Sequence, residues 1–327
     1  MCSRLNHYLQ LFSTIRADKN CKRWGRETCH QAPHKPFLLL SIFDLIATRQ
    51  INRNFVDISF DLAELFANYW SKVMPVGTSG AMSYPFYYLS SAEFWHLVEQ
   101  PGVPHESGRT VSSVKRLREL YLGARFDDDL YSLLVMENSR EKLRHVLVKT
   151  FFAEEVQPVI LQQSLIHQGA SFYCDKLLRI AEEKGLYQEA LVAADEDTRG
   201  RIRDQGFRKA IVKLYQHRCA LCGIRMLTPE GHTIVEAAHI VPWSKSQDDK
   251  PQNGLALCRL CHWSFDEGLM SVGRDYEVLI SPAIRQDNNF PGHMETLSAR
   301  GIFRPQVSGY WPAQENLDYH RTKIYRK

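Results

Sequence analysis

The 327-residue chain lacks any apolar run long enough to cross a bilayer. Its longest apolar stretch, residues 37–46, contains Ser41 and Asp44, whereas a membrane-spanning helix needs about 20 mainly apolar residues. Residues 1–10 contain no apolar core of the kind that export signals carry. These absences predict a cytoplasmic protein with no membrane partner.

A strong charge of either sign is also missing, as are internal repeats and low-complexity tracts. The formal net charge of +4 at pH 7 permits nucleic-acid binding but does not demand it. The hydrophobic share of 44% and the charged share of 24% are ordinary values for a soluble globular protein. The length of the chain favours two domains over one.

Cysteine is the residue type whose spacing is informative. Four of the eight cysteines form two Cys-x-x-Cys pairs, Cys219/Cys222 and Cys258/Cys261. In a long chain without an export signal, this spacing favours a metal site over disulfides. Each pair can present two thiolates to one ion, and two pairs complete a closed tetrahedral site. We therefore expect a structural Zn²⁺. The remaining cysteines lack such spacing and are interpreted as reduced thiols: Cys2, Cys21, Cys29 and Cys174.

Helical and strand-like patterns alternate along the rest of the chain. Apolar residues that are continuous or recur at helical spacing predict helices at residues 37–46, 61–70, 142–152 and 206–215. The aromatic segment Tyr84-Pro-Phe-Tyr-Tyr-Leu89 instead predicts a short strand, and Pro85 favours its edge or its start. A loop rich in Gly, Ser and Pro precedes it.

Between and after the cysteine pairs lies a composite motif. It reads Val235-Glu-Ala-Ala-His-Ile-Val-Pro242, then Asn253-Gly-Leu-Ala-Leu-Cys258, then Cys261-His-Trp-Ser-Phe-Asp-Glu-Gly268. This string resembles the HNH endonucleases over about residues 205–282. The resemblance implies a two-stranded hairpin and a helix around one divalent cation, and hydrolysis of a DNA phosphodiester.

The residue chemistry agrees with that reaction. A neutral imidazole at His239 can take a proton from water near pH 7. His262 can hold a metal ion through one ring nitrogen, and Asp266 lies four residues later, on the same face of a helix. The amide of Asn253 can tie its loop to the backbone near His239 and so orient the imidazole. Catalytic roles are therefore predicted for His239, Asn253 and His262.

One position departs from the family pattern. Many relatives carry a metal-binding acidic residue directly before the histidine base, where this chain has Ala238. Glu236 lies two residues from Ala238 and on the same face of a strand. The carboxylate ligand is therefore either Glu236 or Asp266. A site with few protein ligands suits Mg²⁺, Mn²⁺ or a similar divalent ion.

The first half of the chain contains two further motifs. Pro33-His-Lys-Pro36 precedes the apolar run at residues 37–46, and Tyr84-Pro85 opens the aromatic segment. Together they resemble the sulfur-binding domain of McrA-type restriction enzymes, over roughly residues 1–160. The resemblance implies double-stranded DNA carrying a phosphorothioate as partner, with these sulfur-binding candidates: His34, Lys35, Tyr84, Pro85 and Tyr88.

The sulfur chemistry is consistent with such a pocket. A non-bridging sulfur is larger, softer and less strongly hydrated than the phosphate oxygen it replaces. A cup formed by a proline ring and an aromatic face accepts it readily. An ordinary phosphate oxygen placed there would lose water without gaining a donor, at a cost of roughly 1–3 kcal/mol. His34 and Lys35 would hold the remaining phosphate oxygens.

These patterns predict an α+β protein with a helix-rich N-terminal DNA-recognition domain and a C-terminal ββα-metal HNH domain that contains a four-cysteine zinc site. The expected division is 1–165 for sulfur binding, 166–198 as a helical connector and 199–327 for the nuclease. Two alternatives stay open: a restriction nuclease for methylated cytosine and a non-catalytic DNA-binding zinc protein. Because one metal site cuts one strand, a double-strand break would need a homodimer or two successive nicks.

Overall fold

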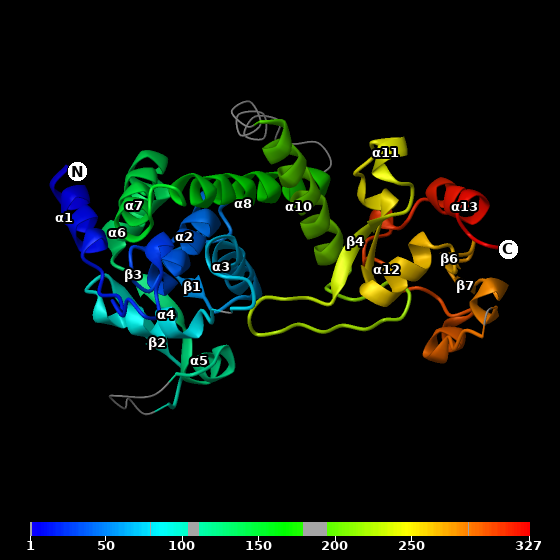
Figure 1. The fold of residues 1–327 in the computed structure, drawn as a ribbon, viewed down its shortest axis with the longest axis horizontal. Helices are drawn as coiled ribbons and strands as arrows, with labels where there is room; N and C mark the ends of the chain where they lie inside the picture. Colours follow the sequence, from blue (N-terminus) through cyan, green and yellow to red (C-terminus); the bar gives the residue numbers. More distant parts are fainter. Residues whose placement is uncertain (1, 79, 104–110, 179–194, 287) are drawn as a thin grey trace. The chain divides into compact units, whose positions relative to one another are not determined.

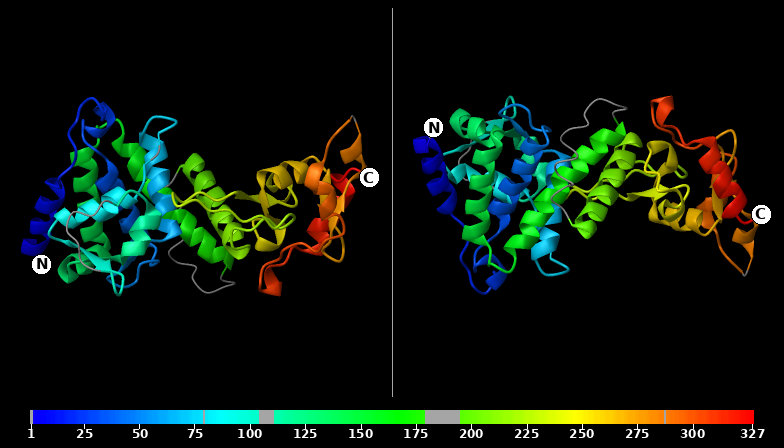
Figure 2. Two further views of the ribbon diagram at one scale, coloured as in Figure 1. Left: turned by 90° about the horizontal axis from the view of Figure 1, so that it is seen from below. Right: turned by 90° about the horizontal axis from the view of Figure 1, so that it is seen from above.

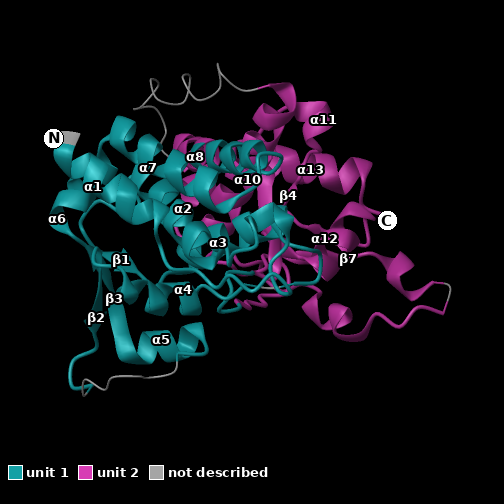
Figure 3. Cartoon of the chain, turned by 60° about the vertical axis from the view of Figure 1, so that its left-hand side comes forward, with its two compact units in different colours: residues 1–168, 228–232 teal, residues 169–227, 233–327 magenta. Residues whose placement is uncertain are grey.

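The computed structural model of the chain describes residues 2–78, 80–103, 111–178, 195–286 and 288–327. Figure 3 colours its two compact units: unit 1 is Met1–Gln168 with Thr228–His232, and unit 2 is Gly169–Leu227 with Thr233–Lys327. No helix in the described ranges is long and apolar enough to pass through a membrane.

The predicted domain boundaries at residues 165/166 and 198/199 stay a prediction. Helix α8 (Gln157–Leu178) passes through the first of these boundaries without a break, and α10 (Glu196–Leu214) passes through the second. Part of the predicted connector, residues 179–194, lies outside the described residues.

Unit 1 is rich in helices and contains one small sheet (Figure 1). Its other elements are α1 (Cys2–Ser13), η1 (Arg26–Thr28), α2 (His34–Ala47), β1 (Val56–Asp57), α3 (Phe60–Val73), α4 (Ser83–Tyr88), η2 (Leu89–Ser91), β2 (Trp95–Glu99), α5 (Val114–Leu120), β3 (Tyr121–Phe126), α6 (Asp128–Val135) and α7 (Glu137–Phe151). The strands run antiparallel in the order β1-β3-β2. Helix α2 is buried from Pro36 to Ile46 and packs against α3, α4, α6 and α7, so it forms the centre of this core.

The predicted helices at residues 37–46, 61–70, 142–152 and 206–215 are present as α2, α3, α7 and α10. The strand predicted at residues 84–89 is wrong, because this segment forms α4 and then η2. Pro85 lies in the first turn of α4, where its missing N–H costs nothing. The indole of Trp95 donates a 2.9 Å hydrogen bond to the Phe86 carbonyl, which helps satisfy the end of this short helix. Tertiary packing therefore overrides the strand propensity of the aromatic residues.

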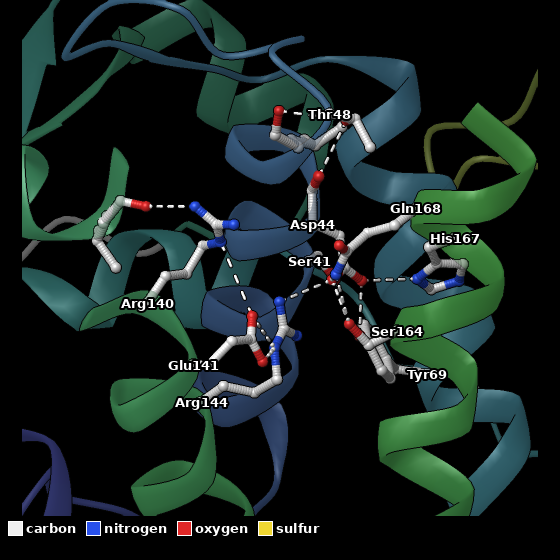
Figure 4. A network of polar contacts seen from close by, with 12 residues as sticks. Ser41, Asp44, Thr48, Tyr69, Arg140, Glu141, Arg144, Ser164, His167 and Gln168 are labelled. Atoms are coloured by element: carbon white, nitrogen blue, oxygen red, sulfur yellow. Dashed lines mark hydrogen bonds and ion pairs between the residues drawn. The ribbon is translucent and has the colours of Figure 1, made fainter. Parts of the chain in front are cut away.

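A buried polar network joins the helices of unit 1 (Figure 4). The carboxylate of Asp44 on α2 accepts hydrogen bonds from the Tyr69 hydroxyl at 2.6 Å and the Ser164 hydroxyl at 2.6 Å. It also contacts Nδ1 of His167 at 2.8 Å and Nη2 of Arg144 at 3.0 Å. These partners come from α3, α7 and α8, so a single carboxylate connects four helices.

Unit 2 contains the end of α8, two antiparallel strand pairs and several short helices. Its elements are α10, β4 (Val235–His239), α11 (Trp243–Ser246), η3 (Pro251–Asn253), β5 (Gly254–Cys258), α12 (Arg259–Asp266), β6 (Met270–Val272), β7 (Val278–Ile280), η4 (Pro282–Arg285), η5 (Gly292–Leu297), η6 (Ser308–Tyr310) and α13 (Gln314–Lys323). Strand β4 pairs with β5, from Val235 opposite Cys258 to His239 opposite Gly254. Helices α10 and α12 both pack on this strand pair.

The end of α8 lies beside α10, as the two green helices in Figure 2 show. Gly206 on α10 permits this close approach, because a Cβ atom there would stand 2.7 Å from the Cβ of Tyr173 on α8. The packing brings the Tyr173 hydroxyl to the loop between β4 and β5, where it donates a hydrogen bond to Asp249.

The C-terminal segment, for which the sequence offered no motif, packs within unit 2. His320 on α13 is fully buried and stacks on Phe265 of α12, with ring centroids 3.6 Å apart. Its Nδ1 lies 2.9 Å from the Ser271 hydroxyl, and its Nε2 lies 3.0 Å from the Phe265 carbonyl. The C-terminal segment therefore packs against α12 and helps to hold this helix in place.

Candidate functional site

The four paired cysteines converge on one point. Cys219 and Cys222 follow α10, Cys258 ends β5 and Cys261 lies in the first turn of α12. Their sulfur atoms all lie within 4.8 Å of one another, and the sulfurs of Cys222 and Cys258 are 3.7 Å apart. A tetrahedral zinc site with Zn–S bonds of about 2.3 Å has sulfur–sulfur edges of about 3.8 Å. The cluster therefore fits a closed zinc site.

His239 ends β4 and is held on two sides. Its ring stacks on Phe207 of α10 with centroids 3.9 Å apart and an interplanar angle of 8°. Its Nε2 lies 2.8 Å from Oδ1 of Asp249, which belongs to the loop between β4 and β5. The imidazole side chain is 20% exposed, so one part of it still reaches solvent.

Asn253 is fully buried at the end of η3 and crosslinks the same loop. Its Oδ1 accepts a hydrogen bond from the Val241 amide at 2.9 Å, and its Nδ2 donates to the Val241 carbonyl at 3.1 Å. Nδ2 also donates to the Asp248 carbonyl at 2.9 Å. One amide thus fixes the backbone just after His239 and just before Asp249.

His262 lies on α12 between the two candidate carboxylates. Its Nδ1 is 3.3 Å from Oε2 of Glu236 on β4, and its Nε2 is 3.5 Å from Oδ2 of Asp266. Partial burial raises the pKa of Asp266, against the lowering effect of His262. Among the described residues, only the four cysteines gather three or more ligand atoms within 4.8 Å. The choice between Glu236 and Asp266 as metal ligand therefore stays open.

Sequence reasoning missed Asp249, the acidic partner of His239. Asp249 is buried, and its Oδ2 accepts a 2.6 Å hydrogen bond from the Tyr173 hydroxyl and lies 3.6 Å from Nε of Arg203. Burial acts to raise the pKa of Asp249, but the hydrogen bonds from His239 and Tyr173 and the charge of Arg203 outweigh it and hold the pKa below its usual value. Asp249 is therefore an anion at neutral pH.

In unit 1, His34 begins α2 and packs against two tryptophans that sequence reasoning also missed. Its ring centroid is 5.2 Å from that of Trp24 and 4.7 Å from that of Trp70. Burial lowers the pKa of His34 to about 4, and the nearby charge of Arg23 adds to the shift. The imidazole is therefore neutral at pH 7, so it can offer a hydrogen bond and an aromatic wall but no positive charge.

Lys35 supplies the charge that His34 lacks. Its ammonium donates a 3.1 Å hydrogen bond to the Ser91 hydroxyl, which in turn donates to the Tyr88 carbonyl at 2.9 Å. These contacts connect the start of α2 to the end of α4. Burial lowers the pKa of Lys35 to about 8, and the charge of Arg16 contributes.

The helical form of α4 arranges the remaining candidates differently from the predicted strand. Tyr84 and Tyr88 are four residues apart, on one face of the helix, and both are exposed, at 43% and 49%. Pro85 points to the buried side. Two exposed tyrosines therefore share one face of α4, whose end is linked to Lys35 through Ser91, while His34 borders the tryptophans.

An antiparallel strand pair followed by a helix, with histidines on β4 and α12 and a buried Asn before β5, defines the ββα class of nuclease domains. Residues 219–273 match the family model of the HNH endonucleases, and residues 11–168 match that of the ScoMcrA-like DNA sulfur-binding domain. The chain therefore carries an HNH endonuclease domain and a ScoMcrA-like DNA sulfur-binding domain. Both resemblances predicted from the sequence are confirmed, as is the α+β fold.

Similarity to individual proteins is weaker. A solved structure described as "Modification dependent TagI restriction endonuclease" is 23% identical, with a TM-score of 0.27. The match covers 36% of this chain and 37% of that chain, little more than a third of either protein. No curated protein matches the chain.

Proposed function

We propose that this protein is a metal-dependent restriction endonuclease that binds duplex DNA carrying a phosphorothioate and cleaves phosphodiester bonds nearby. The observation that carries the proposal is the combination of an HNH endonuclease domain with a DNA sulfur-binding domain in one chain. The HNH domain supplies the cleavage chemistry, and the sulfur-binding domain selects modified DNA.

At the nuclease site, His239 acts as the general base that takes a proton from the attacking water. Asn253 holds the loop that follows His239. His262, with Glu236 or Asp266, is the residue set that would hold Mg²⁺, Mn²⁺ or a similar ion. Such an ion would offset charge on the phosphate and on the leaving oxygen. The four-cysteine cluster would hold Zn²⁺ in a purely structural role.

At the sulfur site, the proposed contacts divide by chemistry. Tyr84 and Tyr88 offer exposed aromatic surface to the weakly hydrated sulfur, and Pro85, buried in the same helix, shapes the turn that carries them. His34, neutral at pH 7, offers a hydrogen bond, and Lys35 offers the positive charge for the phosphate oxygens. Selection against plain DNA follows because an ordinary phosphate oxygen would be desolvated by the apolar surface without a donor in return.

The test compares cleavage of three duplexes of one sequence: plain, cytosine-methylated and carrying a single phosphorothioate. The full-length protein with Mn²⁺ should cut only the phosphorothioate duplex. His239→Ala should lower the cleavage rate by roughly 100- to 10,000-fold, the range that general base catalysis contributes, and should leave DNA binding intact. His232→Ala, at an exposed histidine, is the matched control and should cut normally. Equal cutting of all three duplexes would refute sulfur selection, and preferential cutting of the methylated duplex would favour the alternative reader.

Lys35 makes DNA binding sensitive to pH. Its pKa of about 8 means that the free protein loses this positive charge as the pH rises through 8. Because phosphate binds the charged form, affinity for the phosphorothioate duplex should fall roughly tenfold between pH 7 and pH 9. Lys35→Arg should remove this decline, since arginine stays protonated throughout.

Fluorescence anisotropy at constant ionic strength measures the effect, because phosphate contacts are salt-dependent. Lys142→Ala, at an exposed lysine on α7, is the matched control and should keep the decline of the unmodified protein. Unchanged affinity of the unmodified protein from pH 7 to pH 9 would contradict a phosphate contact by Lys35.

A further inference from the structure

The carboxylate of Asp249 makes a close polar contact with His239 and was not among the site residues predicted from the sequence. It stands on the loop between β4 and β5, ten residues after the histidine, and is buried. Oδ1 faces Nε2 of His239 at 2.8 Å. Oδ2 is occupied separately by the Tyr173 hydroxyl at 2.6 Å and by the more distant Arg203 at 3.6 Å. Each oxygen therefore has its own partners.

The surrounding structure holds Asp249 from several directions. The side chain of Asn253 fixes the Asp248 carbonyl and thereby the backbone next to Asp249. Tyr173 reaches it from α8 through the close packing at Gly206. Arg203 is itself placed by Trp243, whose ring centroid lies 3.6 Å from the guanidinium carbon. A carboxylate with this many supports is fixed in direction relative to the imidazole.

We propose that Asp249 is the positioning residue for His239: it holds the imidazole in the tautomer with the proton on Nε2, which leaves Nδ1 as the atom that takes the proton from water. The inference rests on the proposed role of His239 as base. An ionised carboxylate accepts hydrogen bonds but cannot donate one, so a 2.8 Å contact requires the proton on Nε2. Phe207 covers one face of the ring, which limits rotation away from this orientation.

The assignment fixes where each proton and electron pair goes. The O–H bond of water breaks and its proton passes to Nδ1, while the water oxygen forms the new bond to phosphorus. The ester bond breaks and the leaving oxygen keeps its electron pair until solvent protonates it. The imidazolium formed in this step faces the Asp249 anion, which stabilises the positive charge as it develops.

The charged and titratable groups that contact the pair are few among the described residues. Arg203 comes from α10 and Tyr173 from α8, and both face Asp249 rather than the histidine ring. Strand β5 places Gly254 opposite His239. Removing the negative charge of Asp249 should therefore make protonation of His239 harder, and the acid limb of the cleavage-rate profile should move to lower pH.

The experiment uses the full-length protein with Zn²⁺ and Mn²⁺ and the phosphorothioate duplex, under single-turnover conditions from pH 5 to pH 9. Asp249→Asn should lower the cleavage rate constant roughly 100- to 10,000-fold, shift the acid limb downward and leave the DNA affinity unchanged. Tyr173→Phe, a milder change, should give a smaller loss in the same direction. Asp197→Asn, at an exposed position in the first turn of α10, is the matched control and should cut normally.

A second readout does not depend on activity. Nitrogen NMR of the unmodified protein should show the proton of neutral His239 on Nε2, and Asp249→Asn should change that tautomer. A proton on Nδ1 in the unmodified protein, or an Asp249→Asn rate equal to or above normal, would overturn the positioning role. If His239→Ala cut normally, the proposed base itself would be wrong. Loss of cutting in His239→Ala together with normal cutting in Asp249→Asn would reject only the role of Asp249.

Discussion

Cys258→Ser is expected to unfold the nuclease unit at neutral pH while the sulfur-binding unit stays folded. Cys258 ends β5, and the other three sulfurs come from the loop after α10 and from α12. An ion at this cluster therefore joins the three elements on which His239 and His262 depend. Zinc binding contributes roughly 10–16 kcal/mol to the folding of zinc-finger peptides, which is as much as the whole stability of a typical domain.

Hydrogen exchange measured by mass spectrometry on the full-length protein tests this expectation. Peptides from β5 and α12 should lose protection in Cys258→Ser, and zinc content should fall from one ion per chain to none. Cys222→Ser, at the half-buried ligand, should give the same result more weakly. Cys21→Ser, at an exposed cysteine of unit 1, should change neither quantity. Full protection of β5 in a zinc-free Cys258→Ser protein would contradict a structural ion.

The nuclease motif could be predicted from the sequence because its chemistry is local. His239 and Asn253 lie on or next to two strands that pair directly, and His262 follows on the next helix. Paired cysteines are likewise a local signal, since two residues of spacing already set the turn. Short-range geometry therefore carries most of the information about this centre.

Asp249 and Tyr173 could not be predicted in the same way. Asp249 lies in a loop ten residues after His239, and Tyr173 stands 76 residues before Asp249. Their meeting depends on the packing of α8 against α10, which a pattern of apolar residues does not specify. The strand predicted at residues 84–89 failed for a related reason: the Trp95 indole, outside the segment, satisfies a carbonyl of α4. Contacts distant in sequence decided both cases.

Asp44→Asn is expected to destabilise the sulfur-binding unit by about 3–5 kcal/mol, because it leaves the buried Arg144 with only the half-exposed Glu141 as counter-charge among its described partners. The side chains of Asp44 and Arg144 are almost completely buried, with 1% and 2% exposed, and their ion-pair distance is 3.0 Å (Figure 4). Asp57→Asn, at an exposed position on β1, is the matched control and should have little effect. Denaturant-dependent hydrogen exchange of α2 and α3 peptides in the full-length protein measures the free energy of unfolding of this unit.

The same variant should remove a specific acid sensitivity. Burial acts to raise the pKa of Asp44, but Arg144, His167 and Ser164 outweigh it and lower the pKa. A lowered folded-state pKa stabilises the protein fully above the unfolded value of about 3.9, and this stabilisation is lost as the pH falls through the folded-state value. Below about pH 4, the unmodified unit should therefore lose the part of its stability that ionised Asp44 contributes. Asp44→Asn should not show this loss.

Adding Arg144→Met to Asp44→Asn should recover part of the lost stability, because the second change removes the buried charge that has lost its Asp44 partner. Full additivity of the two losses would contradict a direct ion pair.

The network also bears on sulfur recognition, since His34 and Lys35 begin the helix that Asp44 anchors. In Asp44→Asn, phosphorothioate affinity should fall at denaturant concentrations that expose α2 to exchange, while β5 and α12 stay protected. Binding lost without exposure of α2 would instead place Asp44 in direct support of the pocket.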